Sequence, residues 1–217
     1  MSTVFPLVSL NIGLPATVVY DGNRDMRSGI LKKPVRGKVF LDRLGFAGDG
    51  VSDSANHGGD DKAICGYCFD HYGYWERELD RKLAFAAFGE NLTISGLVET
   101  VIRIGDIYRL GEAEIQCTQP RQPCLKLNRI FGLKDMARKV QTTGFSGYYF
   151  RVLTPGWVAY DSALSLLQPG PGQFSVEAAN NLMHGDDQRD LNKLREIVSF
   201  PPLSQSWREV FAQRLGD

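Results

Sequence analysis

Two neighbouring stretches, Ile102–Leu110 (IRIGDIYRL) and Glu114–Gln119 (EIQCTQ), decide the fold class of this chain. Each is a short run that contains β-branched residues, and the glycine-containing turn Leu110-Gly111-Glu112 lies between them. Short runs of this kind, separated by a turn signal, predict β-strands. We therefore expect two strands joined by a tight turn at the centre of the sequence.

The same pattern extends from this point in both directions. Further short apolar or β-branched runs lie at 7–12, 16–20, 39–44, 91–94, 150–153, 156–160 and 163–167. The polar segment Asp21–Gly29 is expected to be a loop. Helices are predicted at Phe69–Leu83, where apolar residues recur three or four positions apart, and at Leu133–Val140. Many short strands with few helices favour a barrel or a closed sandwich, so we predict a mostly β fold.

The composition changes at the run Gln168-Pro169-Gly170-Pro171-Gly172-Gln173. A segment so rich in proline and glycine predicts a linker, which we place at residues 168–174. Three helical segments are expected after it, at 175–183, 188–197 and 204–215, and Ser175 is a typical helix start. Residues 175–217 are therefore predicted to form a small three-helix module.

Charge and composition exclude several classes of protein. Lys and Arg number 25, Asp and Glu also number 25, and the net charge of zero provides no global basic field for nucleic acid. No apolar stretch reaches the roughly 18–20 residues that span a bilayer. Met1 to Gly13 has no basic stretch before its apolar residues, so we expect no signal peptide. The 4 cysteines do not resemble a disulfide framework, which favours a reducing, cytoplasmic setting.

The first segment with possible chemistry is His57-Gly58-Gly59-Asp60-Asp61-Lys62. Its two glycines allow the backbone to turn tightly beside a ligand, and His57 and Lys62 supply hydrogen-bond donors to a polar or anionic group. A hairpin turn with solvated charges is the alternative interpretation. The later segment Phe88-Gly89-Glu90-Asn91-Leu92 has the same two interpretations, as a ligand-orienting segment or as a turn that enters a strand.

The segment Gln119-Pro120-Arg121-Gln122-Pro123-Cys124-Leu125-Lys126 carries a cysteine between two cations. Its prolines stiffen the backbone and oppose a helix. Nearby positive charge lowers a thiol pKa and favours the thiolate, which binds soft metals or attacks electrophiles. Cys124 is therefore a candidate metal ligand, and a buried, inert cysteine is the alternative.

The segment Cys65-Gly66-Tyr67-Cys68 matches the C-x-x-C pattern of zinc and redox sites. A structural zinc site needs four ligands, usually from two such pairs or from one pair with two histidines. Cys117 and Cys124 are seven residues apart, and the chain has only 3 histidines. We therefore interpret Cys65 as a strand residue and Cys68 as a residue at the start of a helix.

Taken together, these segments resemble the MOSC family, which is named for the C-terminal domain of molybdenum-cofactor sulfurases, and its bacterial YiiM-like branch in particular. The resemblance rests on the segments around His57, Phe88 and Cys124 and on Ile104-Gly105-Asp106-Ile107-Tyr108-Arg109-Leu110-Gly111, in this order and spacing. It extends from about Gly37 to Leu167. A three-helix tail is typical of the same branch.

The resemblance implies a MOSC-type β-barrel at residues 37–167, with strands of residues 1–36 packed on it. It implies a molybdenum–pterin cofactor (molybdopterin), with Cys124 as the thiolate on the metal. The cofactor carries a phosphate, so Lys62, Arg121 and Lys126 are expected anion contacts. The cofactor-binding residues are then Gly58, Gly59, Lys62, Asn91, Arg121 and Lys126, and the catalytic residues are Cys124 and His57. His57 would orient the cofactor or pass a proton to the leaving hydroxyl.

The implied activity is reduction of N-hydroxylated compounds, including hydroxylamino bases. Residues 168–217 contain no cysteine, so a separate iron–sulfur protein or flavoprotein is expected as electron donor. The alternatives are a sulfur carrier with a persulfide on Cys124, and a cofactor carrier without turnover. A DNA-binding role for the tail is also considered, but its acidic residues outnumber its basic ones.

Overall fold

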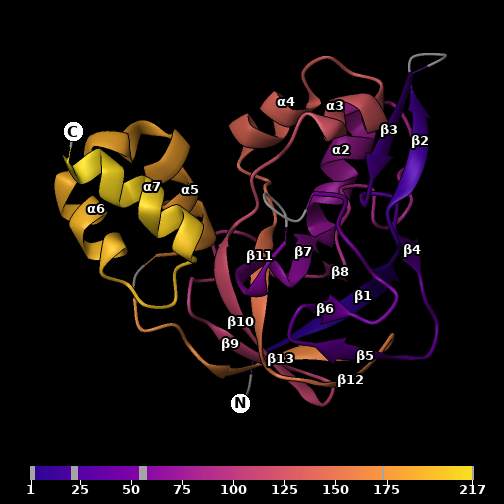
Figure 1. Ribbon diagram of the computed structural model, residues 1–217, viewed down its shortest axis with the longest axis horizontal. Helices are drawn as coiled ribbons and strands as arrows, with labels where there is room; N and C mark the ends of the chain where they lie inside the picture. The colour runs from indigo at the N-terminus through magenta and orange to yellow at the C-terminus, as the bar shows by residue number, and fades with distance from the viewer. Residues whose placement is uncertain (1–2, 21–23, 54–57, 173, 217) are drawn as a thin grey trace.

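Seven strands form a closed barrel in the structure, a computed structural model that describes residues 3–20, 24–53, 58–172 and 174–216 (Figure 1). Their order is β13 (Ala163–Gln168), β9 (Ile107–Leu110), β10 (Ala113–Pro120), β11 (Tyr148–Thr154), β7 (Ile64–Cys68), β8 (Leu92–Ile94) and β1 (Val4–Ile12). β13 then pairs with β1 and closes the ring. All pairs are antiparallel except β7 with β8. The predicted mostly β barrel is confirmed.

The N-terminal strands differ from the prediction in two ways. β1 pairs with both β8 and β13, so it is a strand of the barrel itself and not a strand packed on its outside. The predicted loop at Asp21–Gly29 was wrong, because β3 (Arg24–Ser28) forms a hairpin with β2 (Ala16–Tyr20). Met26 and Ser28 are buried while Arg24, Asp25 and Arg27 are exposed, so the strand has a single apolar residue that faces inward. A strand with so little apolar content gives no periodicity for sequence analysis to find.

The smaller elements complete the sheet structure. β4 (Lys33–Pro34) adds to the edge of β1, and a separate sheet has the order β12 (Gly156–Ala159), β5 (Lys38–Asp42), β6 (Gly45–Phe46). The barrel core contains large side chains from all around the ring, including Leu10, Ile64, Leu110, Ile115 and Phe150.

A second core lies under three short helices, α2 (Tyr72–Glu78), α3 (Lys126–Phe131) and α4 (Met136–Thr143). It is largely aromatic: the ring of Tyr67 from β7 stacks on Phe88 with centroids 4.3 Å apart, and its hydroxyl accepts a hydrogen bond from Trp75 Nε1 at 2.6 Å. The predicted helix 69–83 was too long, because it begins as the 3₁₀ turn η2 (Phe69–His71) and α2 ends at Glu78. α3 was missed because the prolines before it favour extended backbone.

The C-terminal residues form the predicted helical module, beside the barrel in Figure 1. Its elements are α5 (Val176–His184), η3 (Asp186–Arg189), α6 (Leu191–Val198) and α7 (Gln205–Gly216). Ser175 caps α5 as expected, since its Oγ accepts a hydrogen bond from Ala178 N at 3.0 Å. None of the helices in the described ranges has the length and apolarity to cross a bilayer.

The segment before the module lies against the barrel. Gly170 N donates to Asp106 Oδ1 at 2.7 Å, and a Cβ on Gly170 would lie 2.4 Å from the carbonyl oxygen of Ile104. Only glycine fits so close an approach. The module therefore starts from a fixed point on the barrel surface.

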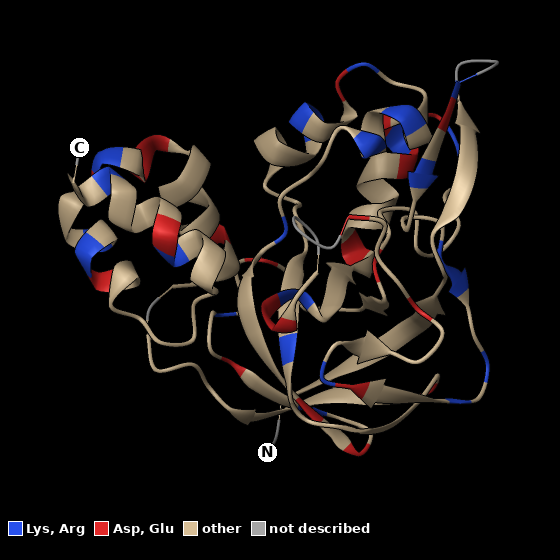
Figure 2. Cartoon of the chain, viewed as in Figure 1, with Lys and Arg blue, Asp and Glu red and all other residues tan. Residues whose placement is uncertain are grey.

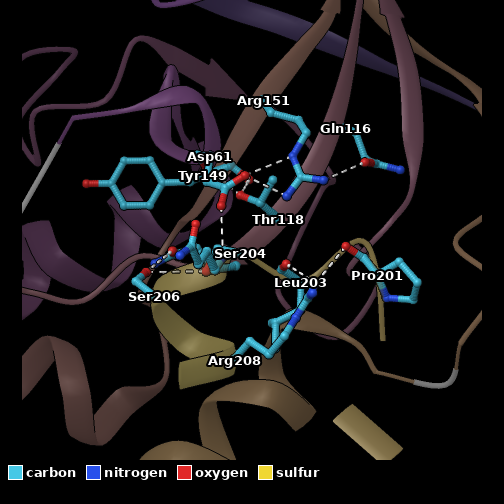
Figure 3. Close-up of polar contacts among 12 residues, drawn as sticks. Asp61, Gln116, Thr118, Tyr149, Arg151, Pro201, Leu203, Ser204, Ser206 and Arg208 are labelled. Atoms are coloured by element: carbon cyan, nitrogen blue, oxygen red, sulfur yellow. Dashed lines mark hydrogen bonds and ion pairs between the residues drawn. The ribbon is translucent and has the colours of Figure 1, made fainter. Parts of the chain in front are cut away.

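Asp61 makes a second attachment between module and barrel (Figure 3). Its Oδ1 accepts from Arg151 Nη2 at 2.6 Å and Nε at 3.0 Å, and its Oδ2 accepts from the backbone N of Gln205, the first residue of α7, at 2.9 Å. Ser204, the residue before α7, donates from its backbone N to the carbonyl oxygen of Thr118 in β10, the strand next to β11, at 3.1 Å. The G-G-D-D-K segment, η1 (Asp60–Lys62) included, thus contacts the N-terminus of α7.

We predict that Asp61→Asn loosens this attachment and lowers the free energy of unfolding by about 1–2 kcal/mol, because asparagine has no charge to pair with Arg151 and its NH₂ group cannot accept from Gln205 N as Oδ2 does. Denaturant unfolding measures the loss, and limited proteolysis should cleave the 168–172 segment faster. Asp60→Asn is the matched control, since the neighbouring Asp60 is exposed. Equal stability of the two variants would contradict the assigned attachment.

Candidate functional site

A cavity of about 300 Å³ opens beside the barrel, between the β3–β4 and β6–β7 connections and the loop that follows β10. Its described walls bring together predicted site residues that lie far apart in the sequence, namely Gly58, Gly59, Lys62, Asn91, Arg121, Cys124 and Lys126. His57 lies outside the described residues. The convergence of the other predicted residues on one cavity is the feature expected of a binding site.

Arg121 is the most distinctive group in this cavity. Its side chain is 6% exposed, and its Nη2 donates to the carbonyl oxygen of Phe88 at 2.7 Å. Its Nη1 is buried and has no hydrogen-bond partner among the residues that the structure describes. A buried N–H without a partner costs about 1–3 kcal/mol, so this atom fits a site that a ligand's acceptor oxygen would complete.

The cavity walls are rich in positive charge. Lys32, Lys62 and Lys126 line them together with Arg121, while Asp49 supplies a carboxylate. Asp49 is engaged, because it pairs with Lys32 in a short contact and accepts from the backbone N of Gly13 at 2.9 Å. The remaining excess of cations favours an anionic ligand.

Lys62 sits where the glycine turn places it. Gly59 has a φ of 92°, in the region that favours glycine, and its carbonyl oxygen accepts from Lys62 N at 3.0 Å. Burial lowers the pKa of Lys62, against the opposing influence of Asp61 and Asp53. Lys126, at the start of α3, donates from Nζ to Ser52 Oγ at 2.7 Å. Both ammonium groups are therefore held at the cavity by the fold.

Asn91 lines the cavity, and its neighbour Glu90 lies behind it in the protein interior. Asn91 Oδ1 accepts from Cys65 N at 3.1 Å, while its Nδ2 donates to Asn11 O at 3.2 Å and Asp49 Oδ2 at 2.8 Å. Glu90 is fully buried and accepts from Phe88 N at 3.1 Å and Thr93 Oγ1 at 2.9 Å. Both side chains are used within the protein, so Asn91 is better suited to fixing the wall than to holding a ligand. The F-G-E-N segment is the turn that enters β8.

Several residues of the cavity had no sequence signal, and three of them carry polar side chains of chemical interest. Lys32 and Asp49 lie in connections without any motif, and Tyr149 is one of several aromatic residues in β11. Tyr149 is 8% exposed, and burial and the neighbouring Cys65 raise its pKa, partly offset by Arg121. Only the closure of the barrel brings these side chains to the same place.

A family model for the MOSC domain matches residues 53–165. The chain belongs to the MOSC family. A second family model, for the YiiM-like 3-alpha helix domain, matches residues 175–216 of the same chain. The resemblance inferred from the sequence, and the helical module expected with it, are therefore confirmed.

Individual relatives agree with this assignment to the MOSC family. The protein YflK of Bacillus subtilis is 47% identical over 210 residues, which cover 97% of this chain and 94% of YflK. The crystal structure of YiiM from Geobacillus stearothermophilus has a TM-score of 0.83 and 37% identity, over 97% of this chain and 99% of that chain. A protein of Gibberella moniliformis named as a reductase is 30% identical over 195 residues, which cover 88% of this chain and 34% of that protein.

The cysteines of this MOSC chain differ sharply in their surroundings. Cys124 is half-buried at the cavity, whereas Cys65, Cys68 and Cys117 are buried. Cys65 lies in β7, and Cys68 ends that strand and begins η2, as the sequence predicts. Burial raises the pKa of Cys65 to about 11 and that of Cys68 to about 12, which opposes the thiolate form. No group of three or more His, Cys, Asp or Glu side chains in the described ranges is placed to hold a metal ion.

We predict that Cys68→Ser lowers stability without changing the activity per folded molecule. Burying a more polar hydroxyl in place of the thiol costs about 1–3 kcal/mol, but Cys68 does not line the cavity. Thermal unfolding and turnover measure the two effects separately. Cys117→Ser, at another fully buried strand position, is the matched control. A specific loss of turnover in Cys68→Ser alone would mean that the C-x-x-C pair has a chemical role.

Proposed function

We propose that this chain binds a molybdenum–pterin cofactor in the 300 Å³ cavity and reduces N-hydroxylated compounds such as hydroxylamino bases. The observation that carries the proposal is the pairing of a half-buried thiol with an anion-binding wall. Cys124 lines the cavity into which Arg121, with its unpartnered Nη1, and the cations Lys62 and Lys126 also face.

The residues present fit the proposed cofactor. A soft thiolate at Cys124 suits a soft metal centre, and the cations suit the phosphate of the pterin. Lys62 and Lys126 would hold that phosphate together with Arg121, and Phe88 and Gly89 line the cavity beside Arg121. A metal delivered on an organic cofactor needs few protein ligands, so a single cysteine is chemically sufficient. When bound, the cofactor would supply two-electron redox chemistry at Cys124.

The overall reaction is R–NH–OH + 2 e⁻ + 2 H⁺ → R–NH₂ + H₂O. The N–O bond breaks, nitrogen takes the electron pair, and the hydroxyl leaves as water. Lys62 is a candidate proton donor at the leaving oxygen, since burial lowers its pKa and it lines the cavity beside Cys124. The sequence also suggests His57 for this step. The electrons would come from a separate iron–sulfur protein or flavoprotein.

Metal analysis and an activity assay test the proposal. Protein from a host that makes the cofactor should contain close to one molybdenum per chain and should reduce a hydroxylamino base when a reductant is present. Protein from a host that cannot make the cofactor is the control and should be inactive. Loaded protein without turnover would instead support a cofactor carrier, and a metal-free persulfide on Cys124 would support a sulfur carrier.

The charge distribution of the C-terminal module does not support DNA binding. Figure 2 shows Lys and Arg interspersed with Asp and Glu along the three C-terminal helices. A helix that follows the phosphates of DNA needs a continuous basic face.

A further inference from the structure

A second cavity reaches Cys124 from the side of the C-terminal module. It measures about 530 Å³ and lies between the segment 119–129, from the end of β10 into α3, and the first two turns of α7. Lys62, Cys124, Lys126 and Tyr149 line both cavities, so the sulfur stands at their junction. A ligand in the first cavity and a second molecule in this one would meet at Cys124.

The floor of the second cavity presents an oriented amide. Gln119 is 1% exposed, its Oε1 accepts from Ser206 Oγ at 3.3 Å, and its Nε2 donates to the carbonyl oxygen of Pro120 at 3.0 Å. An amide fixed at both ends offers its remaining N–H and lone pair in a defined direction. Such groups recognise the donor and acceptor edge of a planar heterocycle.

Helix α7 supplies the opposite wall. Ser206 and Val210 are four residues apart and therefore lie on the same face of the helix. Val210 is 38% exposed and Leu125 across the opening is 71% exposed, which gives the cavity two apolar edges. The start of α7 is held against the barrel by two hydrogen bonds (Figure 3). Asp61 accepts from Gln205 N, and Thr118 accepts from Ser204 N just before the helix.

The cations Lys62, Lys126 and Arg129 line this cavity together with the carboxylate of Asp53, and two of these cations have partners within the protein. Lys126 donates to Ser52, and the Arg129 guanidinium lies over the Tyr20 ring at 4.9 Å. The uncharged lining includes the amide of Gln119, the hydroxyl of Ser206 and the apolar edges. This part of the lining fits a planar, uncharged nitrogen base.

We propose that the second cavity is the substrate compartment, that it takes an uncharged planar N-hydroxylated base, and that Ser206 and Val210 of the C-terminal module determine its specificity. This inference rests on the proposed reductase function for its chemistry, but the route to Cys124 stands on geometry alone. The module is then part of the substrate site as well as a structural appendage.

The first experiment needs no cofactor. In the apo protein, Cys124 should react with N-phenylmaleimide, a planar bulky reagent, through the wide second cavity. Val210→Trp should slow this alkylation at least tenfold but slow iodoacetamide, a small reagent, less than threefold. Ala212→Trp is the matched control, since it is exposed on the same helix and turned away from Val210. Peptide mass spectrometry separates Cys124 from the three buried cysteines.

The second experiment uses the loaded enzyme. Val210→Trp should raise KM at least tenfold for a purine-sized hydroxylamino base and leave KM for hydroxylamine unchanged. Ser206→Ala should raise KM for the same base threefold to tenfold with kcat nearly constant, because Gln119 loses its hydrogen-bond partner. A catalytic role for Ser206 would lower kcat instead.

The outcomes separate the two proposals. Unchanged N-phenylmaleimide reactivity in Val210→Trp would overturn the second cavity as the route to Cys124, whatever the reductase result. Selective slowing in Val210→Trp, together with no turnover by fully loaded wild-type protein, would retain the compartment and overturn the proposed reaction. Equal KM changes for both substrates in Val210→Trp would overturn the assignment of specificity.

Discussion

Replacing Cys124 with serine should reduce turnover of a hydroxylamino base to background. Serine puts a hard hydroxyl, protonated at neutral pH, where the metal needs a soft thiolate. The substitution is nearly isosteric at a half-buried position in a loop, so the free energy of unfolding should change by less than about 1 kcal/mol. The protein should therefore fold normally and fail in chemistry alone.

The comparison must be made at equal molybdenum loading and with saturating reductant. Pterin and phosphate contacts are independent of the sulfur, so cofactor content by itself would not report on the role of Cys124. Cys65→Ser is a useful companion variant, because Cys65 lines the same cavity but is 7% exposed and has a raised pKa. Undiminished turnover in Cys124→Ser would remove this residue from the mechanism and overturn the proposed function.

Replacing Arg121 with methionine should cause the largest loss of anion binding in this protein. Hydrogen bonds to a charged group contribute about 1.5–3 kcal/mol, which corresponds to roughly a tenfold to hundredfold loss of affinity. Inorganic phosphate should raise the melting temperature of wild-type apo protein and have no effect on Arg121→Met. Molybdenum content of protein from a cofactor-making host should fall in parallel.

Arg121 also stabilises the fold through its hydrogen bond to the Phe88 carbonyl, so control variants must distinguish a loss of stability from a loss of anion binding. Arg121→Met leaves the buried Phe88 carbonyl without its donor, at a cost of about 1–3 kcal/mol in stability. Arg81→Met removes another arginine-to-carbonyl bond, the part-buried one of 3.3 Å from Arg81 Nη2 to the carbonyl oxygen of Phe131, outside the cavity. Arg121→Lys keeps the charge but cannot reproduce the fork geometry, so its affinity should be intermediate. Wild-type phosphate stabilisation in Arg121→Met would show that the unpartnered Nη1 is not part of an anion site.

Several elements were predictable because their signals are local. A turn glycine between two β-branched runs predicts β9 and β10, and the Pro/Gly run and Ser175 mark the start of the C-terminal module. The predicted helix 69–83 was too long because the apolar periodicity continues past Glu78, where α2 ends. The positive φ of Asp80, which interrupts the helix, has no signal in the sequence. The start of α3 was also missed, because Pro120 and Pro123 before it favour extended backbone.

The sequence by itself determined which residue types carry the chemistry of this protein. Glycines that tolerate positive φ, a cysteine between cations and the order of the motifs are properties of short segments, and they predicted the family and part of the cavity lining. Tertiary structure alone decided how those groups are used. It paired Lys32 with Asp49 and gave Asn91 and Glu90 hydrogen-bond partners within the protein. It left Arg121 Nη1 without a partner among the described residues, and it placed α7 beside Cys124. The physical reason is that hydrogen-bond partners, burial and cavity walls arise between segments that are distant in sequence. They exist only after the barrel closes and the module docks.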